Sequence, residues 1–411
     1  MVLSVVGPDF HAPLRKLRMV GLRAYLAAAF GALLVAHGEA AGASEAGITP
    51  DTILFGQVAA LSGAASALGQ GMRRGIEAAF DEVNRAGGVH GRKLRLISRD
   101  DGYEPDRSVV ETGRLIDDDK VFALIGAVGT PTTTRTAPMA SAASVPFIAP
   151  FTGARFLRDP GLANVVNIRA SYGAEAEAWI KHLTEDLHLT SIAIFYQDDA
   201  FGQDGLAGVK KALEKRGLEL TAEATYERNT IAVRSALRVL KRAEPQAVVM
   251  VGAYKPCAEF IRLARRSDFK AVFVNVSFVG ANALAADLGP EGAGVIVSEV
   301  VPFPWDTSLK VVADYQAALR ARDARASPDF VSLEGYLAGR LVAAALGRIG
   351  PEPTRQALLS ALNDDGRFDL GGLVMRFGAN NGVTDPPVFL TVIQPDGSFR
   401  PVDRLDPELF H

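Results

Sequence analysis

Short apolar segments alternate with amphipathic segments along most of this chain of 411 residues. Residues 53–60 are almost continuously apolar, which predicts a strand buried on both faces. Between residues 72 and 83 apolar side chains recur at helical spacing, and Gly87-Gly88 follows where a helix can end on a left-handed residue. The same two patterns predict strands at residues 94–98, 121–128 and 145–149, and helices at residues 108–116 and from residue 131 onward.

The alternation starts again near residue 168. It predicts helices at residues 173–188 and 201–215, and strands at residues 191–196, 218–226, 247–252, 271–277 and 294–301. Strands of this kind, separated by helices, are typical of parallel sheets covered on both faces. We therefore expect an α/β fold with two five-stranded lobes in tandem.

The C-terminal part follows a third pattern. Beyond Pro302-Phe303-Pro304, long helices are predicted at residues 308–322 and 330–346. A short helix and two apolar strands, at residues 373–377 and 388–393, are expected near the end.

The first 43 residues have the composition of a targeting segment. Basic residues between positions 15 and 23 precede an apolar stretch at residues 24–36, and small residues follow up to Ala41-Gly42-Ala43. This order predicts a signal peptide at residues 1–43, cleaved near Ser44, and a mature chain exported to the periplasm. The apolar stretch is shorter than the span of about 20 residues that crosses a membrane, although an uncleaved anchor is the alternative. Either Met1 or Met19 could be the true start.

Composition and charge exclude several classes of protein. Hydrophobic residues make up 48% and charged residues 22% of the chain, as in ordinary globular proteins. The formal net charge is −3 and no long basic run occurs, so a nucleic-acid partner is not expected. Cys257 is the only cysteine, which excludes an intrachain disulfide framework and a cysteine-rich metal cluster. We expect it to be a buried, inert side chain.

Catalytic and cofactor motifs are missing from the sequence. It contains no His-Glu-x-x-His, Gly-x-Ser-x-Gly or Walker pattern. Gly69, Gly71 and Gly75 are spaced one residue too widely for a dinucleotide-binding turn. Asp100-Asp101 could belong to a metal or acid/base site, but a capped turn is the preferred interpretation. We predict that the protein is not an enzyme and uses no cofactor or metal; a secreted hydrolase built around His90 is the weaker alternative.

The carboxyl ends of the predicted strands carry hydroxyl and aromatic residues, and ligands of open α/β sheets bind at these ends. Thr130-Pro131 is the most informative pair, because Thr suits an N-cap and Pro the first helical position. The free N–H groups and the dipole of such a helix start suit a carboxylate. Alternatively, Thr130 caps its own helix and has no further role.

Several motifs occur in a specific order: Ala60-Leu61-Ser62-Gly63 with Leu68-Gly69, Asp81-Glu82-Val83-Asn84 with Ala86-Gly87-Gly88-Val89-His90-Gly91, Arg99-Asp100-Asp101-Gly102-Tyr103-Glu104-Pro105, Pro150-Phe151-Thr152-Gly153-Ala154, and Tyr196-Gln197-Asp198-Asp199-Ala200-Phe201-Gly202. With these motifs the chain resembles, from about residue 48 to residue 393, the type I periplasmic solute-binding proteins of the branched-chain amino acid (leucine/isoleucine/valine) transport group.

The resemblance implies a fold of two doubly wound Rossmann-like lobes joined by three crossovers. The first lobe would comprise residues 48–168 and 302–348, and the second residues 169–301 and 349–405. It further implies a monomer that binds a small solute and delivers it to the permease and ATPase subunits of an ABC transporter. A ligand sensor of the same fold, acting on a regulatory partner, is the alternative.

The resemblance also transfers ligand-binding positions to this chain. They are Leu68, Thr130, Phe151, Thr152, Gly153, Phe201, Tyr254 and Ser277. Thr130 corresponds to a carboxylate-binding hydroxyl and Phe201 to an aromatic lid. At the position of Ser277, amino-acid binders of the family have a glutamate that pairs with the ligand ammonium.

The serine at position 277 changes the expected ligand. A buried ammonium without a counter-charge is costly, so the serine weakens the case for an α-amino acid. Asp198 or Asp199 could substitute for the missing glutamate. We expect a small solute with a carboxylate or carbonyl end and an apolar or aromatic body.

Overall fold

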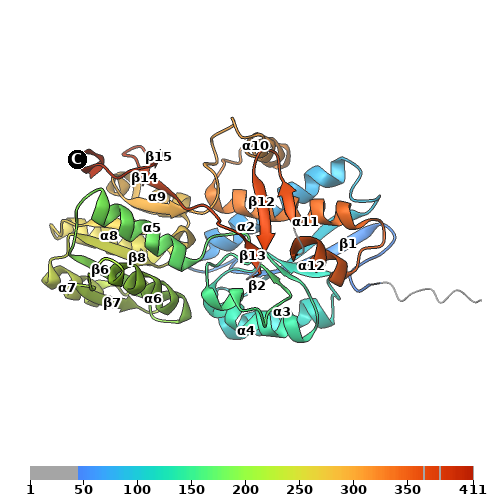
Figure 1. Cartoon of the computed structure of the whole chain (residues 1–411), viewed down its shortest axis with the longest axis horizontal. Coiled ribbons are helices and arrows are strands. Elements are labelled where there is room, and N and C mark those ends of the chain that lie inside the picture. The colour runs from blue at the N-terminus through green and yellow to red at the C-terminus, as the bar shows by residue number, and fades with distance from the viewer. Residues whose placement is uncertain (1–44, 364–365, 379–380, 411) are drawn as a thin grey trace, which may run out of the picture. The chain divides into compact units, whose positions relative to one another are not determined.

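The computed structural model describes residues 45–363, 366–378 and 381–410, so the predicted signal peptide lies outside the described residues. The described chain is an α/β structure with two large sheets, each flanked by helices (Figure 1). The two predicted series of alternating strands and helices form these two sheets. Cys257 is buried and unpaired, as expected.

The first sheet is entirely parallel, with the strand order β2-β1-β3-β4-β5. Its strands are β1 (Thr52–Ala59), β2 (Lys93–Asp100), β3 (Ala123–Ile125), β4 (Phe147–Ile148) and β5 (Val165–Val166). Its helices are α2 (Ser66–Arg85), α3 (Pro105–Asp117) and α4 (Thr130–Ala142), and the short 3-10 helix η1 (Arg155–Arg158) follows β4. The order reverses direction on either side of β1, so the ends of β1 and β3 open onto the region where a ligand can bind.

The second sheet has seven strands in the order β15-β14-β10-β9-β8-β6-β7. Five are parallel: β6 (Ile192–Gln197), β7 (Ala222–Tyr226), β8 (Ala247–Val251), β9 (Val272–Asn275) and β10 (Ile296–Glu299). The expected total of five was wrong, because β14 (Phe389–Ile393) and β15 (Phe399–Val402) from the end of the chain add two antiparallel strands. The accompanying helices are α5 (Tyr172–Glu185), α6 (Ala200–Glu214), α7 (Arg234–Ala243), α8 (Tyr254–Arg266), α9 (Ala281–Leu288), η2 (Ser277–Val279) and η3 (Gly289–Gly292).

The segment after β10 returns to the first sheet. It forms α10 (Lys310–Arg322), α11 (Phe330–Ile349), α12 (Arg355–Asn363) and a small antiparallel sheet of β11 (Arg367–Asp369), β12 (Val374–Gly378) and β13 (Gly382–Val383). The last described element is η4 (Pro407–Phe410). Arg355 donates to the carbonyl oxygens of Val121 and Phe122 at 2.8 and 3.0 Å. Gly382, in β13, also forms a β-bridge with Asn167, directly after β5. The start of α12 and strand β13 therefore lie against the first sheet, whereas the predicted division assigned all of residues 349–405 to the second lobe.

Helix α11 packs closely against α2. A Cβ atom on Gly75 would lie 1.9 Å from the carbonyl oxygen of Ser332, and one on Gly335 would lie 2.3 Å from that of Met72. Among the described residues, α11 is also the helix long and apolar enough to cross a membrane by length and composition. However, 78% of its 18-residue apolar stretch is buried inside the protein, as in the core helix of a globular domain. Gly75 and Gly335 are required where they stand, because any larger residue would prevent the backbones of α2 and α11 from touching.

This contact gives a stability prediction. Replacing Gly75 with Ala forces α2 and α11 apart and should lower the free energy of unfolding by about 1–3 kcal/mol. Gly347 is the matched control, because it lies on α11 with no atom within 4 Å of its Cβ position. Gly347→Ala should be neutral or stabilise by up to about 1 kcal/mol through helix propensity. Urea unfolding of both variants measures the difference, and equal stabilities would contradict the proposed contact.

Candidate functional site

Helix α4 begins one residue earlier than the sequence suggested. Gly129 is its N-cap and Thr130 its first helical residue, so the expectation that Thr130 is the N-cap was wrong. Gly129 has a positive φ of 101°, and a Cβ there would lie 2.2 Å from the ring of Tyr103. Since glycine alone tolerates both conditions, the cap falls on Gly129 and the hydroxyl of Thr130 is left for another partner.

That partner is Thr152, in the loop after β4. The two hydroxyl oxygens lie 2.7 Å apart, and the Thr152 hydroxyl is also 3.1 Å from the hydroxyl of Tyr172 at the start of α5. All three side chains are buried. Burial raises the pKa of Tyr172 to about 12 despite the opposing charge of Arg169, so it stays a neutral donor. The structure thus brings together two predicted residues and one that the sequence reading missed.

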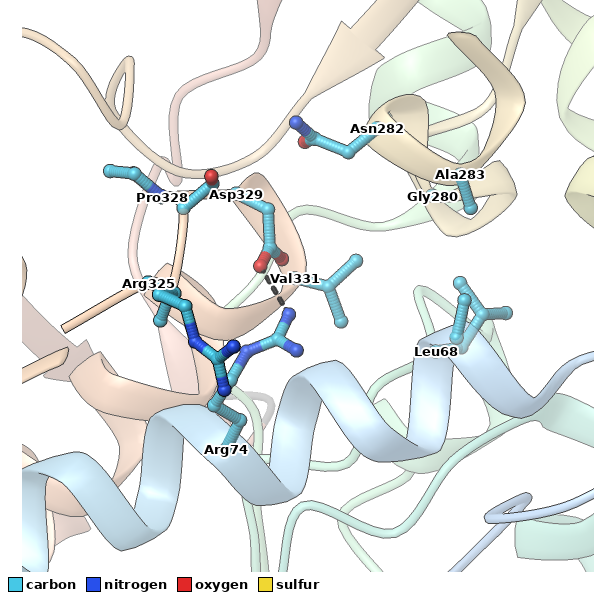
Figure 2. A pocket seen from close by; sticks show the side chains of 12 residues that line it. Leu68, Arg74, Gly280, Asn282, Ala283, Arg325, Pro328, Asp329 and Val331 are labelled. Carbon is cyan, nitrogen blue, oxygen red and sulfur yellow. Dashed lines mark hydrogen bonds and ion pairs between the residues drawn. The ribbon is translucent and has the colours of Figure 1, made fainter. Parts of the chain in front are cut away.

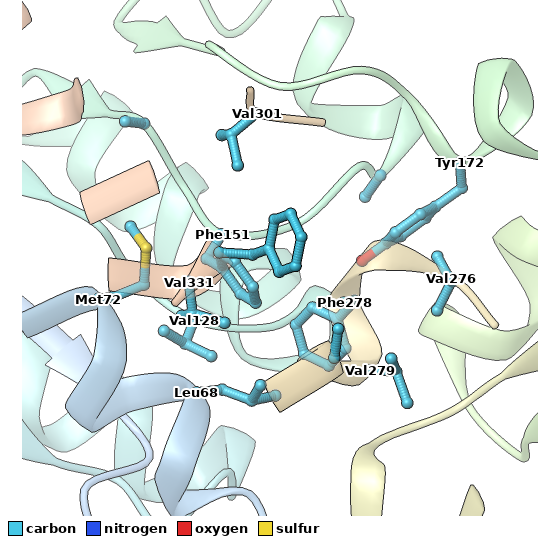
Figure 3. Packing of buried hydrophobic residues seen from close by; sticks show 14 of the residues in the cluster. Leu68, Met72, Val128, Phe151, Tyr172, Val276, Phe278, Val279, Val301 and Val331 are labelled. Carbon is cyan, nitrogen blue, oxygen red and sulfur yellow. The ribbon is translucent and has the colours of Figure 1, made fainter. Parts of the chain in front are cut away.

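An aromatic cluster lies beside these hydroxyl groups. The ring of Phe278, in η2, lies 5.4 Å from that of Phe151, 4.7 Å from that of Phe201 and 6.0 Å from that of Tyr103, between centroids. Phe201 in turn lies 5.2 Å from Tyr172. Figure 3 shows the ring of Phe278 beside that of Phe151. Phe278 and Tyr103 were not among the predicted site residues, although both follow predicted strands.

The remaining predicted residues lie around this cluster. The hydroxyl of Tyr254 accepts the backbone N–H of Ala67 at 3.4 Å, which joins the start of α8 to the start of α2. Leu68 packs against Gly280, where a Cβ would lie 2.5 Å from its side chain. Gly153 allows α5 to approach, since a Cβ there would lie 2.8 Å from the backbone nitrogen of Tyr172. Leu68 additionally lines a pocket of about 440 Å³ (Figure 2).

Ser277 is engaged entirely by neighbouring charged side chains. Its backbone N–H and its hydroxyl each donate to the carboxylate of Glu175 at 2.9 Å, and its hydroxyl oxygen accepts from Arg169 at 2.5 Å. The Glu175 oxygen that accepts the Ser277 N–H also accepts a hydrogen bond from the Ser298 hydroxyl at 2.5 Å. Ser277 therefore positions η2 and offers no spare donor.

Arg169 is the centre of a buried charge cluster that the sequence reading missed. Its guanidinium lies 3.4 Å from Glu334 and 4.4 Å from the centre of the Phe151 ring. Burial raises the pKa of Glu334 to about 7, and burial with nearby Glu175 raises that of Glu299 well above its usual range. Burial alone would lower the pKa of Arg169, but Glu334 and Glu175 raise it, so the guanidinium stays protonated.

Polar contacts at the edge of the cluster join the two halves of the molecule. Glu104, before α3, accepts from Arg228 at 3.0 Å and from the amide of Asn229 at 2.6 Å, both after β7. Arg228 also donates to Asp199 at 3.2 Å, and Asp199 caps α6 by accepting the N–H of Phe201. Asp199 is therefore occupied, and Asp198 is exposed, so neither faces the aromatic cluster as a free counter-charge.

The pair Asp100-Asp101 forms a capped turn, as preferred. The Asp100 carboxylate accepts hydrogen bonds from the backbone N–H groups of Leu61, Ser62 and Gly102. The Asp101 carboxylate accepts one from the backbone N–H of Tyr103 and one from the Ser108 hydroxyl. No group of three or more potential ligands suited to a metal occurs among the described residues. His90, the residue considered for a hydrolase, has Nε2 3.1 Å from the carbonyl oxygen of Gly347. The turn at Asp100 and Asp101 is therefore structural, and it places the ring of Tyr103 beside that of Phe278.

Comparison with known proteins adds independent findings. A family model described as periplasmic binding protein matches residues 52–398. An amino acid binding protein of Pseudomonas aeruginosa is 26% identical over 310 residues, covering 74% of this chain and 81% of that protein.

Two solved structures are similar in fold and sequence. One is a possible leucine/isoleucine/valine-binding protein from Rhodopirellula baltica SH 1, with a TM-score of 0.81 and 38% identity, covering 86% of this chain and 96% of the other. The second is a substrate-binding periplasmic protein from Ralstonia solanacearum, with a TM-score of 0.81 and 29% identity, covering 85% and 100%.

The buried turn carboxylate gives a pH prediction. Burial and nearby Asp100 raise the pKa of Asp101 to about 6, although hydrogen bonds from Ser108 and Tyr103 oppose the shift. The folded state then holds a proton that the unfolded state releases, so stability should fall as pH rises from about 4 to about 6. Asp101→Asn should remove up to about 2–3 kcal/mol of this loss in urea unfolding.

Asp117→Asn is the control, since Asp117 is an exposed carboxylate at the end of α3. It should keep the wild-type dependence on pH. Parallel curves for Asp101→Asn and the wild type would show that Asp101 titrates normally.

Proposed function

We propose, from the premise that this chain belongs to the periplasmic binding protein family, that it is the solute-binding component of an ABC importer. It binds a small solute with a carboxylate or carbonyl end and an apolar or aromatic body, makes no covalent bond to it, and delivers it to a permease with ATPase subunits. Membership of this family and the two-lobed type I fold confirm the resemblance and the fold class predicted from the sequence.

The observation that carries the proposal is the contact between the three hydroxyl groups and the aromatic rings. Thr130, Thr152 and Tyr172 meet at the start of α4, where the helix dipole favours negative charge. Phe201 lies 5.2 Å from the ring of Tyr172, and Phe151 directly precedes Thr152, so both place apolar rings beside these hydroxyl groups. A ligand with an oxygen-rich end and an apolar body has matching partners for both parts.

Charge around the hydroxyl groups favours an anionic end. The buried Arg169 is close enough to lower the pKa of Tyr172, against the larger effect of burial. The position that carries an ammonium-pairing glutamate in amino-acid binders of the family is Ser277, and its donors are bound to Glu175. A carboxylate without an α-ammonium therefore fits better than an amino acid.

An α-amino acid is the second candidate. The relative from Pseudomonas aeruginosa is named an amino acid binding protein. In this chain, Glu299 and Glu334 are buried near Arg169, and one oxygen of each makes no hydrogen bond within the described residues. These two carboxylates are the groups that would pair with a ligand ammonium.

Isothermal titration separates the two candidates. Leucine, isoleucine and valine are compared with the keto acids that lack only the ammonium. We expect the keto acids to bind about tenfold more tightly or better, because neither carboxylate is free to balance a buried ammonium. Glu334 is paired with Arg169 at 3.4 Å, and burial raises the pKa of Glu299 well above its usual range, which favours its neutral form. Amino acids binding more tightly than every keto acid would reverse this conclusion and assign the site to amino acids.

The same titration with Thr152→Ala tests the location of the site. Loss of its hydroxyl should weaken binding by about 1–3 kcal/mol. Thr136→Ala is the control. The Thr136 hydroxyl donates to a carbonyl within α4 and is not one of the three hydroxyl groups that meet at the start of this helix.

The second step of the proposal is export. Residues 1–43 have the order of a signal peptide but lie outside the described residues. Expressed in a Gram-negative host, the protein should appear in the periplasmic fraction, and mass spectrometry should show a chain that begins near Ser44. An intact N-terminus in the membrane fraction would instead indicate an anchored protein.

A further inference from the structure

We propose that Phe278 determines the size of the solute, because its ring occupies the space between the two aromatic walls into which the apolar body of a ligand would extend. The inference rests on the proposed function. It narrows the ligand class to carboxylates with a short or branched aliphatic body, and excludes an aromatic body unless the ring of Phe278 is removed.

Phe278 touches aromatic rings from both halves of the molecule. Its centroid is 5.4 Å from that of Phe151 in the first half and 4.7 Å from that of Phe201 in the second. Tyr103, also from the first half, lies 6.0 Å away. Phe278 is fully buried, and Leu68 and Val279 complete its surroundings in Figure 3. The ring therefore fills the centre of the aromatic cluster.

The backbone of η2 holds this ring in place from both sides. Before it, Ser277 is fixed by the three hydrogen bonds to Glu175 and Arg169. After it, Gly280 has a positive φ of 75° and packs against Leu68. Because η2 is fixed at both ends, the backbone of Phe278 cannot shift without breaking buried polar contacts. The rings of Phe151, Phe201 and Tyr103 pack around its side chain and restrict its rotation.

A large apolar body would have to displace this fixed ring or separate Phe151 from Phe201. Protein interiors tolerate added volume poorly, so each extra carbon beyond the available space weakens binding. A body of a few aliphatic carbons can lie along the ring edges instead. Ser277 is thus a positioning residue for Phe278, which explains why a serine stands there without facing the ligand.

Replacing Phe278 with Ala tests the inference. The variant should bind phenylacetate and benzoate about tenfold more tightly than the wild type does, and the keto acid of valine about tenfold more weakly. Phe278→Leu, which keeps an apolar side chain and guards against loss of folding, should shift the preference in the same direction by less. Phe273→Ala is the control, because Phe273 packs on Phe260 and Phe269 in the second sheet and should leave the size order unchanged.

A neutral aromatic probe separates this inference from the proposed function. Toluene should raise the melting temperature of Phe278→Ala but not that of the wild type, because an enclosed apolar space of ring size binds such molecules. If toluene acts in this way while no carboxylate binds either protein, the variant is folded with an open apolar space, so the proposed function fails and with it the selection of solute size by Phe278. If carboxylates bind with the same size order in both proteins, or toluene has no selective effect, the role of Phe278 is refuted.

Discussion

Arg169 is a fully buried cation, and burying a charge without partners costs roughly several kcal/mol. It stands on the stretch between β5 and α5, where the chain passes from the first sheet to the second. The groups that neutralise it come from separate elements, with Glu334 on α11 and Glu175 on α5, the latter reached through Ser277. The requirement to neutralise one buried guanidinium thus ties the helix beside the first sheet to the strand ends of the second. The order of η2, and with it the aromatic cluster, follows from this constraint.

The hydroxyl groups of Thr130, Thr152 and Tyr172 show which hydrogen bonds a ligand would have to replace. In the structure Thr130 and Thr152 satisfy each other, so a ligand oxygen exchanges one hydrogen bond for another and gains only about 1 kcal/mol for each. Affinity must then come mainly from apolar contact with the rings, each of which buries a large surface. For the proposed solute, the polar end would fix the orientation and the aromatic cluster would supply most of the binding free energy.

The sequence was informative where local pattern decides structure and silent where distant residues meet. Helical and strand periodicity located both large sheets, because that signal depends on burial alone. The two-residue strand β5 gives little periodic signal and was not predicted, and the antiparallel pairing of β14 depends on β10, nearly a hundred residues away. Residues at strand ends were recognised as candidates, since topology collects them at one edge. Arg169 and Glu334 were missed because no spacing rule relates positions so far apart, and the cap moved to Gly129 because of a contact with Tyr103.

The hydrogen bonds among Glu104, Asp199 and Arg228 join the two halves at the edge of the aromatic cluster, so they relate ligand binding to the contact between the halves. Asp199 both caps the helix that carries Phe201 and holds Arg228, which reaches Glu104 on the other half. A ligand can shift the balance between separated and joined halves only by binding one arrangement better than the other. Contact with Thr152 alone leaves that balance unchanged, because this hydroxyl belongs to the first half in either arrangement. The joined state gains only when the same ligand also touches Phe201 or Phe278. Under the proposed function, the aromatic residues of the second half therefore decide both which solute is held and whether its binding favours the joined halves.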